Sequence, residues 1–180
     1  MAFDNIKPTD NVGIVGIGGL GHLAIKFAKA WGCEVTAFTH STSKLEEAKR
    51  LGADRVVSSV DGNAINAMAS KLDMLLITAN VPLNWSAFIS TLAPNGRLHI
   101  VGAVLEPIPI TAFDLMMTQR IITGSPTGSP VMIAKMLEFA ARHGIAATVE
   151  HFPMSKVNDA IAYLLAGKAR YRVVLDANFA

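Results

Sequence analysis

The stretch that decides the fold is residues 12–21, V-G-I-V-G-I-G-G-L-G, which are followed by His22 and a helical pattern. The apolar first half has the composition of a strand that is buried on both faces. The glycines that follow allow a tight turn and a close approach of the backbone to a ligand. A helix that begins after this turn directs free N–H groups at whatever lies in front of it, which suits a pyrophosphate. Strand, turn and helix together therefore predict a dinucleotide site.

Length and composition favour a globular domain with a real core, because 51% of the 180 residues are hydrophobic. The net charge of +2 comes from scattered residues of both signs, with no basic stripe, so we expect no nucleic-acid partner. The apolar stretches are strand-sized and the N-terminus lacks a signal-peptide pattern, so we expect no membrane partner. The single cysteine, Cys33, excludes an internal disulfide and a cysteine-rich zinc site. We expect a cytoplasmic domain.

Apolar runs alternate with helical stretches along the chain. Most runs are unbroken, as expected of strands that helices cover on both faces. We predict six strands, at Val12–Val15, Val35–Phe38, Arg55–Val57, Met74–Ile77, Leu98–Val101 and Ile121–Ile122. With helices between them and right-handed crossovers, these strands predict an α/β fold, a doubly wound, six-stranded parallel sheet of the Rossmann type.

The predicted helices carry start and stop signals. The helix after the glycines is expected to end at Gly32. Ser43 is expected to cap a second helix, with Glu46 as its capping-box partner. Asn84 or Pro82 is expected to begin a short one.

The end of the chain is expected to be a separate tail. A helical stripe runs from Val157 to Leu165, and a strand-like run follows at Tyr171–Leu175. Six strands are already complete by residue 125. We therefore predict a dinucleotide-binding domain over residues 1–145 and a tail with an extra helix and strands over residues 146–180.

Small or polar residues follow the predicted strands, where an open parallel sheet binds its ligand. These candidate site residues are Gly16, Ile17, Gly18, Gly19, Leu20 and Gly21 after the first strand, Thr39, His40, Ser41, Thr42, Ser43 and Lys44 after the second, Thr78, Ala79 and Asn80 after the fourth, Gly102, Ala103 and Val104 after the fifth, and Gly124, Ser125 and Pro126 after the sixth.

The residues after the second strand indicate the form of the cofactor. A site for NAD normally has an acidic residue here for the ribose 2′-hydroxyl, and that charge would repel the 2′-phosphate of NADP. This chain has Thr39, His40, Ser41 and the cation Lys44 instead, which suits a phosphate. The serines also serve as an ordinary helix start. The missing carboxylate favours NADP over NAD.

Other conspicuous residues have simpler interpretations. His22 could face a pyrophosphate or be a partly exposed packing residue, and both hypotheses stay open. His99, inside a strand, is expected to be a hydrogen-bonded interior histidine rather than a catalyst, and Cys33 is expected to be inert. No set of His, Cys, Asp and Glu has metal-ligand spacing. Neither Tyr163 nor Tyr171 begins the Tyr-x-x-x-Lys pair of short-chain reductases.

Several separated stretches resemble one family. G-I-G-G-L-G-H-L-A-I-K-F-A-K-A-W-G (Gly16–Gly32) is similar to the fingerprint helix of zinc-dependent, medium-chain alcohol dehydrogenases, in particular the cinnamyl-alcohol-dehydrogenase-like group, which uses NADP. The supporting stretches are Glu46–Asp54, Leu92–Gly102, Ile122–Ser125 and Gly167–Asp176. The similarity extends from about Lys7 to Asp176.

The resemblance assigns roles to the candidate residues. It places Gly16–Gly21 at the pyrophosphate, and Val101–Ala103 and Gly124–Pro126 at the nicotinamide. It places Thr39, His40, Ser41 and Lys44 at the 2′-phosphate, although His40 departs from the small or hydroxyl residue expected there. Arg172 is similar in place to an arginine that reaches the pyrophosphate, and it could equally be a solvated strand residue.

The resemblance also implies an activity, namely reversible oxidation of an alcohol or reduction of an aldehyde by hydride transfer. In that family a separate N-terminal domain supplies the zinc, the proton relay and most of the substrate pocket, and we expect these 180 residues to contain none of it. We expect this chain to bind the cofactor, to contain no catalytic residue or metal ligand, and to be inactive alone. The alternatives are a non-catalytic dinucleotide sensor or interaction module and part of a zinc-free reductase of the same superfamily. A homodimer through a sheet edge or the tail is plausible.

Overall fold

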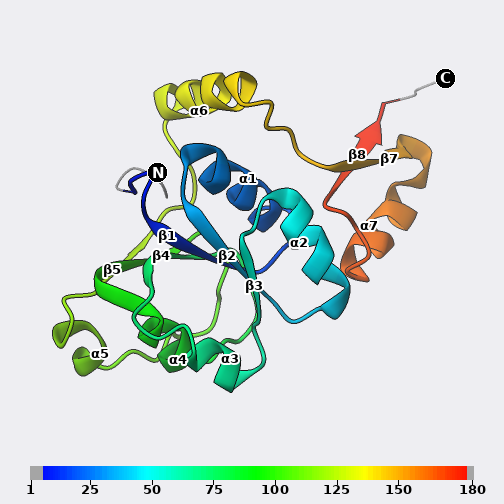
Figure 1. The fold of residues 1–180 in the computed structure, drawn as a ribbon. Coiled ribbons are helices and arrows are strands. Elements are labelled where there is room, and N and C mark those ends of the chain that lie inside the picture. Colours follow the sequence, from blue (N-terminus) through cyan, green and yellow to red (C-terminus); the bar gives the residue numbers. More distant parts are fainter. Residues whose placement is uncertain (1–5, 178–180) are drawn as a thin grey trace. The chain divides into compact units, whose positions relative to one another are not determined.

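The computed structural model describes residues 6–177, and the chain divides into two compact units, Met1–Ile145 and Ala146–Ala180. The first unit contains a six-stranded parallel sheet in the order β3-β2-β1-β4-β5-β6 (Figure 1). Its strands are β1 (Asn11–Val15), β2 (Glu34–Thr39), β3 (Arg55–Ser58), β4 (Leu72–Ile77), β5 (Leu92–Ile100) and β6 (Ile121–Gly124). The predicted doubly wound sheet is confirmed, and its order reverses between β1 and β4.

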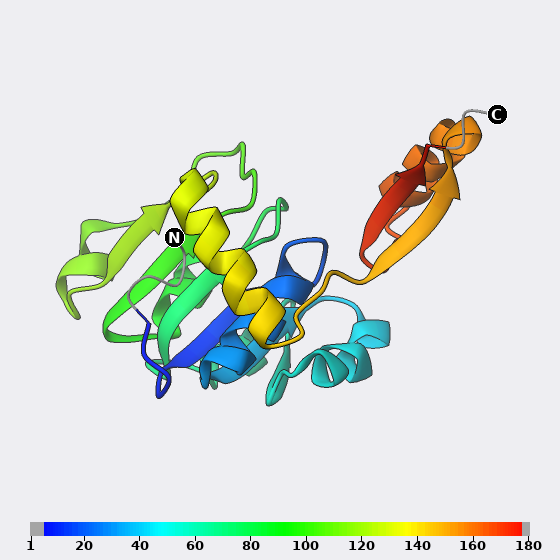
Figure 2. The same cartoon turned by 90° about the horizontal axis from the view of Figure 1, so that it is seen from above.

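Helices cover both faces of this sheet (Figure 1). On one side α1 packs on β1 and β2, and the ring of Phe27 in α1 stacks on Phe139 of α6 with centroids 5.9 Å apart. Figure 2 looks down on this side, with α6 in front of the strands. On the other side lie α3 and α4. The helices of the unit are α1 (Gly21–Trp31), α2 (Leu45–Leu51), α3 (Gly62–Asn66), α4 (Trp85–Ser90), α5 (Ala112–Met116) and α6 (Pro130–Arg142).

Three helix boundaries test the predicted start and stop signals. Gly32 ends α1 in the left-handed conformation at φ 108°, as predicted, because glycine has no Cβ to oppose it. Asn84 caps α4 by accepting a hydrogen bond from the Ala87 N–H at 3.2 Å, which confirms one of the two predicted starts. The capping box at Ser43 is wrong. A 3₁₀ turn, η1 (Thr42–Lys44), occupies that segment, and Lys44 is the residue before α2.

The fifth strand is longer than predicted, and two short helices were not foreseen. β5 begins at Leu92, not Leu98, and contains the segment Pro94-Asn95-Gly96. Its pairing with β4 is irregular between Leu72 and Met74, which accommodates that segment within the strand. α3 and α5 have five residues each, too short for a hydrophobic period to show in the sequence.

The core on the α3/α4 side is built around two phenylalanines. Phe38 of β2 and Phe88 of α4 are fully buried, and their rings meet edge to face with centroids 5.4 Å apart. This geometry is a favourable aromatic arrangement. The rings are surrounded by the buried side chains of Val15, Leu72, Leu75, Ile77, Ile89, Leu92 and Leu98. The core therefore joins α4 to the middle of the sheet.

The second unit is a small β-α-β arrangement. β7 (Val149–Pro153) and β8 (Arg172–Asp176) pair in parallel, and η2 (Met154–Lys156) and α7 (Val157–Leu165) connect them. Ala160 of α7 and Tyr171 are buried. The side chains of Ile161, Leu164 and Leu165 on α7 are exposed by 50%, 51% and 81%. The unit therefore leaves part of its apolar helix surface uncovered.

Truncating the ring of Phe88 tests this account of the core. We expect Phe88→Ala to lower the free energy of unfolding by about 3–5 kcal/mol, because it removes a buried ring and leaves a cavity. The matched control is Phe113→Ala on α5, whose side chain is 71% exposed and should cost less than about 0.5 kcal/mol. Urea denaturation followed by circular dichroism measures both, and equal losses would contradict this packing.

Candidate dinucleotide site

The turn between β1 and α1 can only be made by glycine at two positions. Gly16 has φ +92°, and a Cβ added there would lie 3.0 Å from the Cβ of Ala79. A Cβ added at Gly21 would overlap the carbonyl oxygen of Gly16. The turn is held from the next strand, because the Thr78 hydroxyl lies 2.9 Å from the carbonyl oxygen of Val15 and 2.8 Å from that of Gly16. It donates its proton to these two acceptors.

Gly18, at the tip of the same turn, faces open space. An added Cβ would have no atom within 4 Å, and the residue is exposed. Its carbonyl oxygen accepts a hydrogen bond from the backbone N–H of His22 at 3.1 Å and lies 2.9 Å from the Nδ1 atom of that residue. His22 is fully buried, so the hypothesis of a partly exposed packing residue is wrong. The buried imidazole therefore lies within hydrogen-bonding distance of the turn, whereas the space beside the Cα atom of Gly18 is open.

The turn after β2 is tied to the glycine turn by one lysine. The Nζ atom of Lys44 donates a hydrogen bond to the carbonyl oxygen of Ile17 at 2.7 Å. Thr39 is buried and accepts from the Ser41 N–H at 3.2 Å, and the hydroxyls of Ser41 and Ser43 lie 2.7 Å apart. His40 is exposed. The structure therefore brings a cation and hydroxyl groups beside the glycine turn, and residues 39–44 contain no carboxylate.

The turns after β4, β5 and β6 join the same edge of the sheet. The N–H groups of Val101 and Gly102 both donate to the carbonyl oxygen of Ile77 at 3.0 Å. A Cβ at Gly102 would overlap the carbonyl oxygen of Ala79, so this position also requires glycine. The N–H of Ser125 donates to the carbonyl oxygen of Ile100 at 3.1 Å. Gly124 ends β6, and Ala103 is exposed.

One predicted site residue belongs to the other unit. Arg172 is the exposed first residue of β8, so its role at a pyrophosphate stays a prediction. The sequence prediction did not include Thr123, whose hydroxyl belongs to the network beside Ser125. Nothing in the sequence near Thr123 marks it, because its importance depends on the pairing of β5 with β6.

His99 is an interior, hydrogen-bonded histidine, as predicted. It is 6% exposed in β5, and its Nδ1 and Nε2 atoms lie 2.8 Å from the Thr123 hydroxyl and 2.9 Å from the Ser125 hydroxyl. Burial lowers the pKa of His99, because desolvation penalises the charged imidazolium. The ring is therefore neutral at pH 7, with one nitrogen that donates and one that accepts.

Cys33 has the properties of an unreactive thiol. It is 2% exposed, and burial, with the negative charges of Asp10 and Asp73, raises its pKa to about 11. Within residues 6–177 no three His, Cys, Asp or Glu side chains gather as metal ligands. No helix in this part of the chain is long and apolar enough to cross a membrane.

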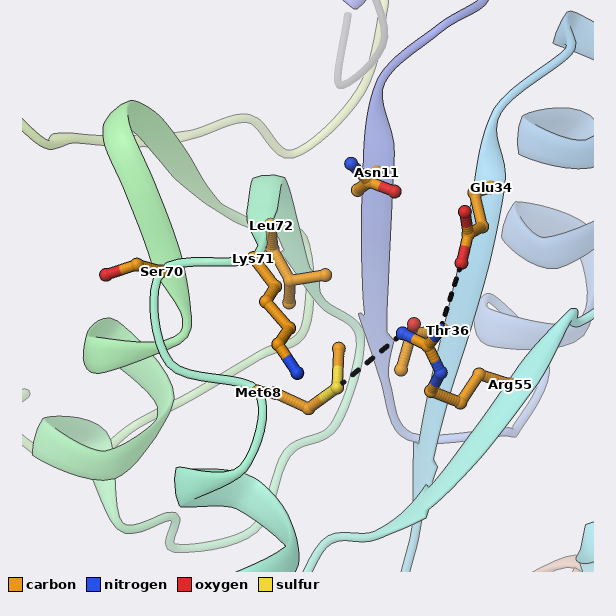
Figure 3. A pocket seen from close by; sticks show the side chains of 8 residues that line it. All are labelled: Asn11, Glu34, Thr36, Arg55, Met68, Ser70, Lys71 and Leu72. Carbon is orange, nitrogen blue, oxygen red and sulfur yellow. Dashed lines mark hydrogen bonds and ion pairs between the residues drawn. The ribbon is translucent and has the colours of Figure 1, made fainter.

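A separate cavity of about 420 Å³ lies at the amino ends of β1–β4, the opposite edge of the sheet (Figure 3). Arg55 spans it, donating to Glu34 at 3.2 Å and to the sulfur of Met68 at 3.8 Å. The other residues that line it are Asn11, Thr36, Ser70, Lys71 and Leu72. This cavity shares no residue with the glycine turn, and its Lys71 therefore serves as a control position for binding experiments.

Comparison with known protein families shows to which family the chain belongs. The sequence profile described as zinc-binding dehydrogenase matches residues 19–177. The chain belongs to the zinc-binding dehydrogenase family. The match confirms the resemblance to zinc-dependent, medium-chain alcohol dehydrogenases and includes the glycine turn from Gly19, the Lys44 turn and the Ser125 turn.

Individual members of the zinc-binding dehydrogenase family agree with this assignment. Aldehyde reductase AdhA of Synechocystis sp. is 52% identical over 172 residues, which are 96% of this chain and 51% of that protein. A cinnamyl alcohol dehydrogenase of Sorghum bicolor superposes with a TM-score of 0.90 at 37% identity, covering 94% of this chain and 48% of that one. The Helicobacter pylori CAD, solved in complex with NADP(H), superposes at 0.84 with 26% identity, covering 97% and 50%. The chain thus spans about half the length of these relatives.

The two glycines of the turn should respond differently to the same added methyl group. We expect Gly21→Ala to destabilise the fold by about 2–4 kcal/mol, because its Cβ would overlap backbone. Gly18→Ala should change stability by less than about 1 kcal/mol, because its methyl group would meet open space. Urea denaturation compares them, and a Gly18→Ala variant as unstable as Gly21→Ala would refute the geometry.

The Cys33 thiol should resist alkylation in the folded chain. With a pKa of about 11, about one thiol in a thousand is ionised at pH 8, against about one in ten for a thiol with an ordinary pKa of 9.0. Labelling by iodoacetamide at pH 8 should be more than about a hundredfold slower in buffer than in urea, since burial adds to the low thiolate fraction. Equal rates in the two solutions would show that the thiol is accessible.

Proposed function

We propose that the first unit binds NADP(H) across the carboxyl ends of β1, β2, β4, β5 and β6. The observation that carries the proposal is the glycine turn. Gly16 has a positive φ and a tight contact with Ala79, Gly21 has no room for a Cβ, and Gly18 opens onto free space. A pyrophosphate fits such a place, since it needs close backbone approach and the N–H groups at the start of α1, an eleven-residue helix. The NADP(H) complex of the Helicobacter pylori relative supports it.

The preference for NADP over NAD rests on the turn after β2. An ammonium group has three N–H donors, so Lys44 can hold the Ile17 carbonyl and also bond a phosphate. The Ser41 and Ser43 hydroxyls and the exposed His40 add donors for the 2′-phosphate. The segment has no carboxylate for a ribose 2′-hydroxyl and none to repel a phosphate.

The remaining roles follow from the strand order. Thr78, Val101, Gly102, Ala103, Gly124 and Ser125 would face the nicotinamide half of the cofactor, since they follow β4, β5 and β6. When bound, the nicotinamide supplies the hydride chemistry. The residues of this chain would bind the cofactor and orient it. Arg172 of the second unit would add a cation for the pyrophosphate.

For the whole protein we propose an NADP-dependent dehydrogenase that interconverts an alcohol and an aldehyde. Support comes from the aldehyde reductase that is 52% identical and from the cinnamyl alcohol dehydrogenase fold. The zinc would lie in the part of the relatives that this chain does not match, so the chain alone would bind cofactor without catalysis. We also propose a cytoplasmic location, supported by the single, buried thiol.

Two surfaces are candidates for contacts with other domains or copies. The tail over residues 146–180 would pack on the catalytic domain through the exposed side chains of α7. A homodimer could form through β6, which ends the sheet and exposes 42% of Ile121, or through α7.

A non-catalytic sensor remains the alternative function, because this chain alone would bind a dinucleotide in either case. A coding sequence that continues upstream into a domain with Cys, His and Glu zinc ligands would support the dehydrogenase. An upstream sequence without such ligands would favour the sensor or a zinc-free reductase of the same superfamily.

Cofactor titrations test the binding proposal directly. We expect NADPH to bind more tightly than NADH, as measured by the change in nicotinamide fluorescence on titration of the chain. Lys44→Ala should weaken NADPH binding about five- to thirtyfold and NADH binding much less, because it removes a charge-assisted bond to the phosphate.

Lys71→Ala is the matched control, because Lys71 lies at the opposite edge of the sheet and should affect neither cofactor. A clear preference for NADH would overturn the NADP proposal. If neither cofactor binds to the unmodified chain, the binding proposal itself is wrong.

A further inference from the structure

The cavity at the amino ends of β1–β4 has a buried floor and a charged rim (Figure 3). Thr36 and Met68 belong to the floor and are 2% and 4% exposed. Glu34, Arg55 and Lys71 belong to the rim and are exposed. The volume of about 420 Å³ lies within the range of sites that bind small organic molecules. The cavity therefore has room for a ligand and not only for a few waters.

Thr36 places a buried hydroxyl on this floor. Side chains alternate along a strand, so Thr36 shares its face of β2 with Phe38, whose ring lies in the core. Within residues 6–177 the Thr36 hydroxyl makes no hydrogen bond, although the residue is almost wholly buried. A buried polar group without a partner is unfavourable, and water or a ligand normally supplies the missing bond. The Thr36 hydroxyl therefore marks the inner end of a polar site.

The two cations of the rim have more hydrogen-bond donors than the protein uses. The Arg55 guanidinium has five N–H groups, of which one bonds the Glu34 carboxylate at 3.2 Å and another the Met68 sulfur at 3.8 Å. The Lys71 ammonium has three donors, and none of them bonds an acceptor in the described part of the chain. The Lys71 side chain extends from the start of β4 toward Met68 and Arg55 (Figure 3). Because the lining residues contribute two cations and only one carboxylate, the cavity has a net positive charge.

We propose that this cavity is a second binding site, which takes a small organic anion with one carboxylate or phosphate-ester group. The oxyanion would accept hydrogen bonds from Lys71 and from the unused N–H groups of Arg55, and bonds of this charge-assisted kind are stronger than neutral ones. The Thr36 hydroxyl would bond a second polar group of the ligand, deeper in the cavity. The site lies at the sheet edge opposite the glycine turn and shares no residue with it, so this inference does not depend on the proposed function.

Occupancy of the cavity would connect two segments that the sheet does not pair. Arg55 begins β3, the edge strand, which pairs with β2. Lys71 directly precedes β4, which pairs with β1 and β5. An anion held by both cations would therefore tie the edge strand to the segment before β4. Hydrogen exchange of the β3 amides should consequently slow when the anion binds.

Titration with defined anions tests the site directly. The probes are lactate, which has a carboxylate and a hydroxyl group, glycerol 3-phosphate, which is a phosphate ester, and lactamide, the neutral counterpart of lactate. At constant ionic strength, lactate or glycerol 3-phosphate should shift the backbone amide signals of Thr36, Arg55 and Lys71 in a saturable manner. The anion that binds more tightly identifies the class of ligand. Lactamide should bind at least about tenfold more weakly than lactate, because it lacks the charge.

Variants identify the groups that hold the anion. Lys71→Ala should weaken binding of the tighter anion about five- to tenfold, and Lys71→Arg, which keeps the charge, less than about threefold. Thr36→Val retains the shape of the side chain without the hydroxyl and should weaken binding about two- to fivefold. Lys135→Ala removes an exposed lysine of α6 and is the matched control, which should leave the affinity unchanged.

Three results would overturn this inference. They are the absence of a saturable shift with either anion, equal affinity for lactate and lactamide, and equal weakening by Lys71→Ala and Lys135→Ala, which would indicate a general effect of surface charge. None of them bears on the glycine turn, because the two sites share no residue and Lys71→Ala remains the control in the cofactor titrations. If the chain responds to the anion as expected but binds neither NADPH nor NADH, the proposed function fails and this site stands.

Discussion

The contact between the start of α1 and the end of β1 sets the geometry of the first unit. At Gly21 the backbone lies so close to the carbonyl oxygen of Gly16 that no side chain can be accommodated. This closeness brings α1 against the sheet directly after the turn, and it leaves the tip at Gly18 facing open space. The same backbone approach that packs the helix therefore creates the place where a phosphate group can approach N–H groups.

Residues of the neighbouring turns form hydrogen bonds to the glycine turn and so stabilise this contact. Thr78 bonds two carbonyl oxygens of the glycine turn, and Lys44 bonds a third, that of Ile17. A Cβ at Gly102 would likewise overlap the carbonyl oxygen of Ala79. These bonds join the ends of β1, β2, β4 and β5 into one connected edge. A dinucleotide that lies along such an edge would meet groups that are already held in place, which lowers the entropic cost of binding.

The two units differ in how completely they bury their apolar surface. The first unit encloses Phe38 and Phe88 with no exposure at all, because helices cover both faces of its sheet. The second has one pair of strands and one principal helix, and Leu165 on that helix is 81% exposed. A unit of this size cannot bury both sides of its helix by itself. This exposed apolar surface supports the proposal that the second unit packs against another domain.

The sequence by itself determined the parallel sheet, the glycine turn and the edge at which the candidate site lies. These features depend on local sequence, because an unbroken apolar run favours a buried strand and closely spaced glycines favour a tight turn. Local sequence pattern was insufficient where strand pairing decided the outcome, as at β5, which begins at Leu92 and not at the predicted Leu98. It also failed at Ser43, which lies in a 3₁₀ turn and not at a helix cap. Only the tertiary structure brought Lys44 to Ile17 and His99 between Thr123 and Ser125, because these contacts depend on which strands and turns become neighbours.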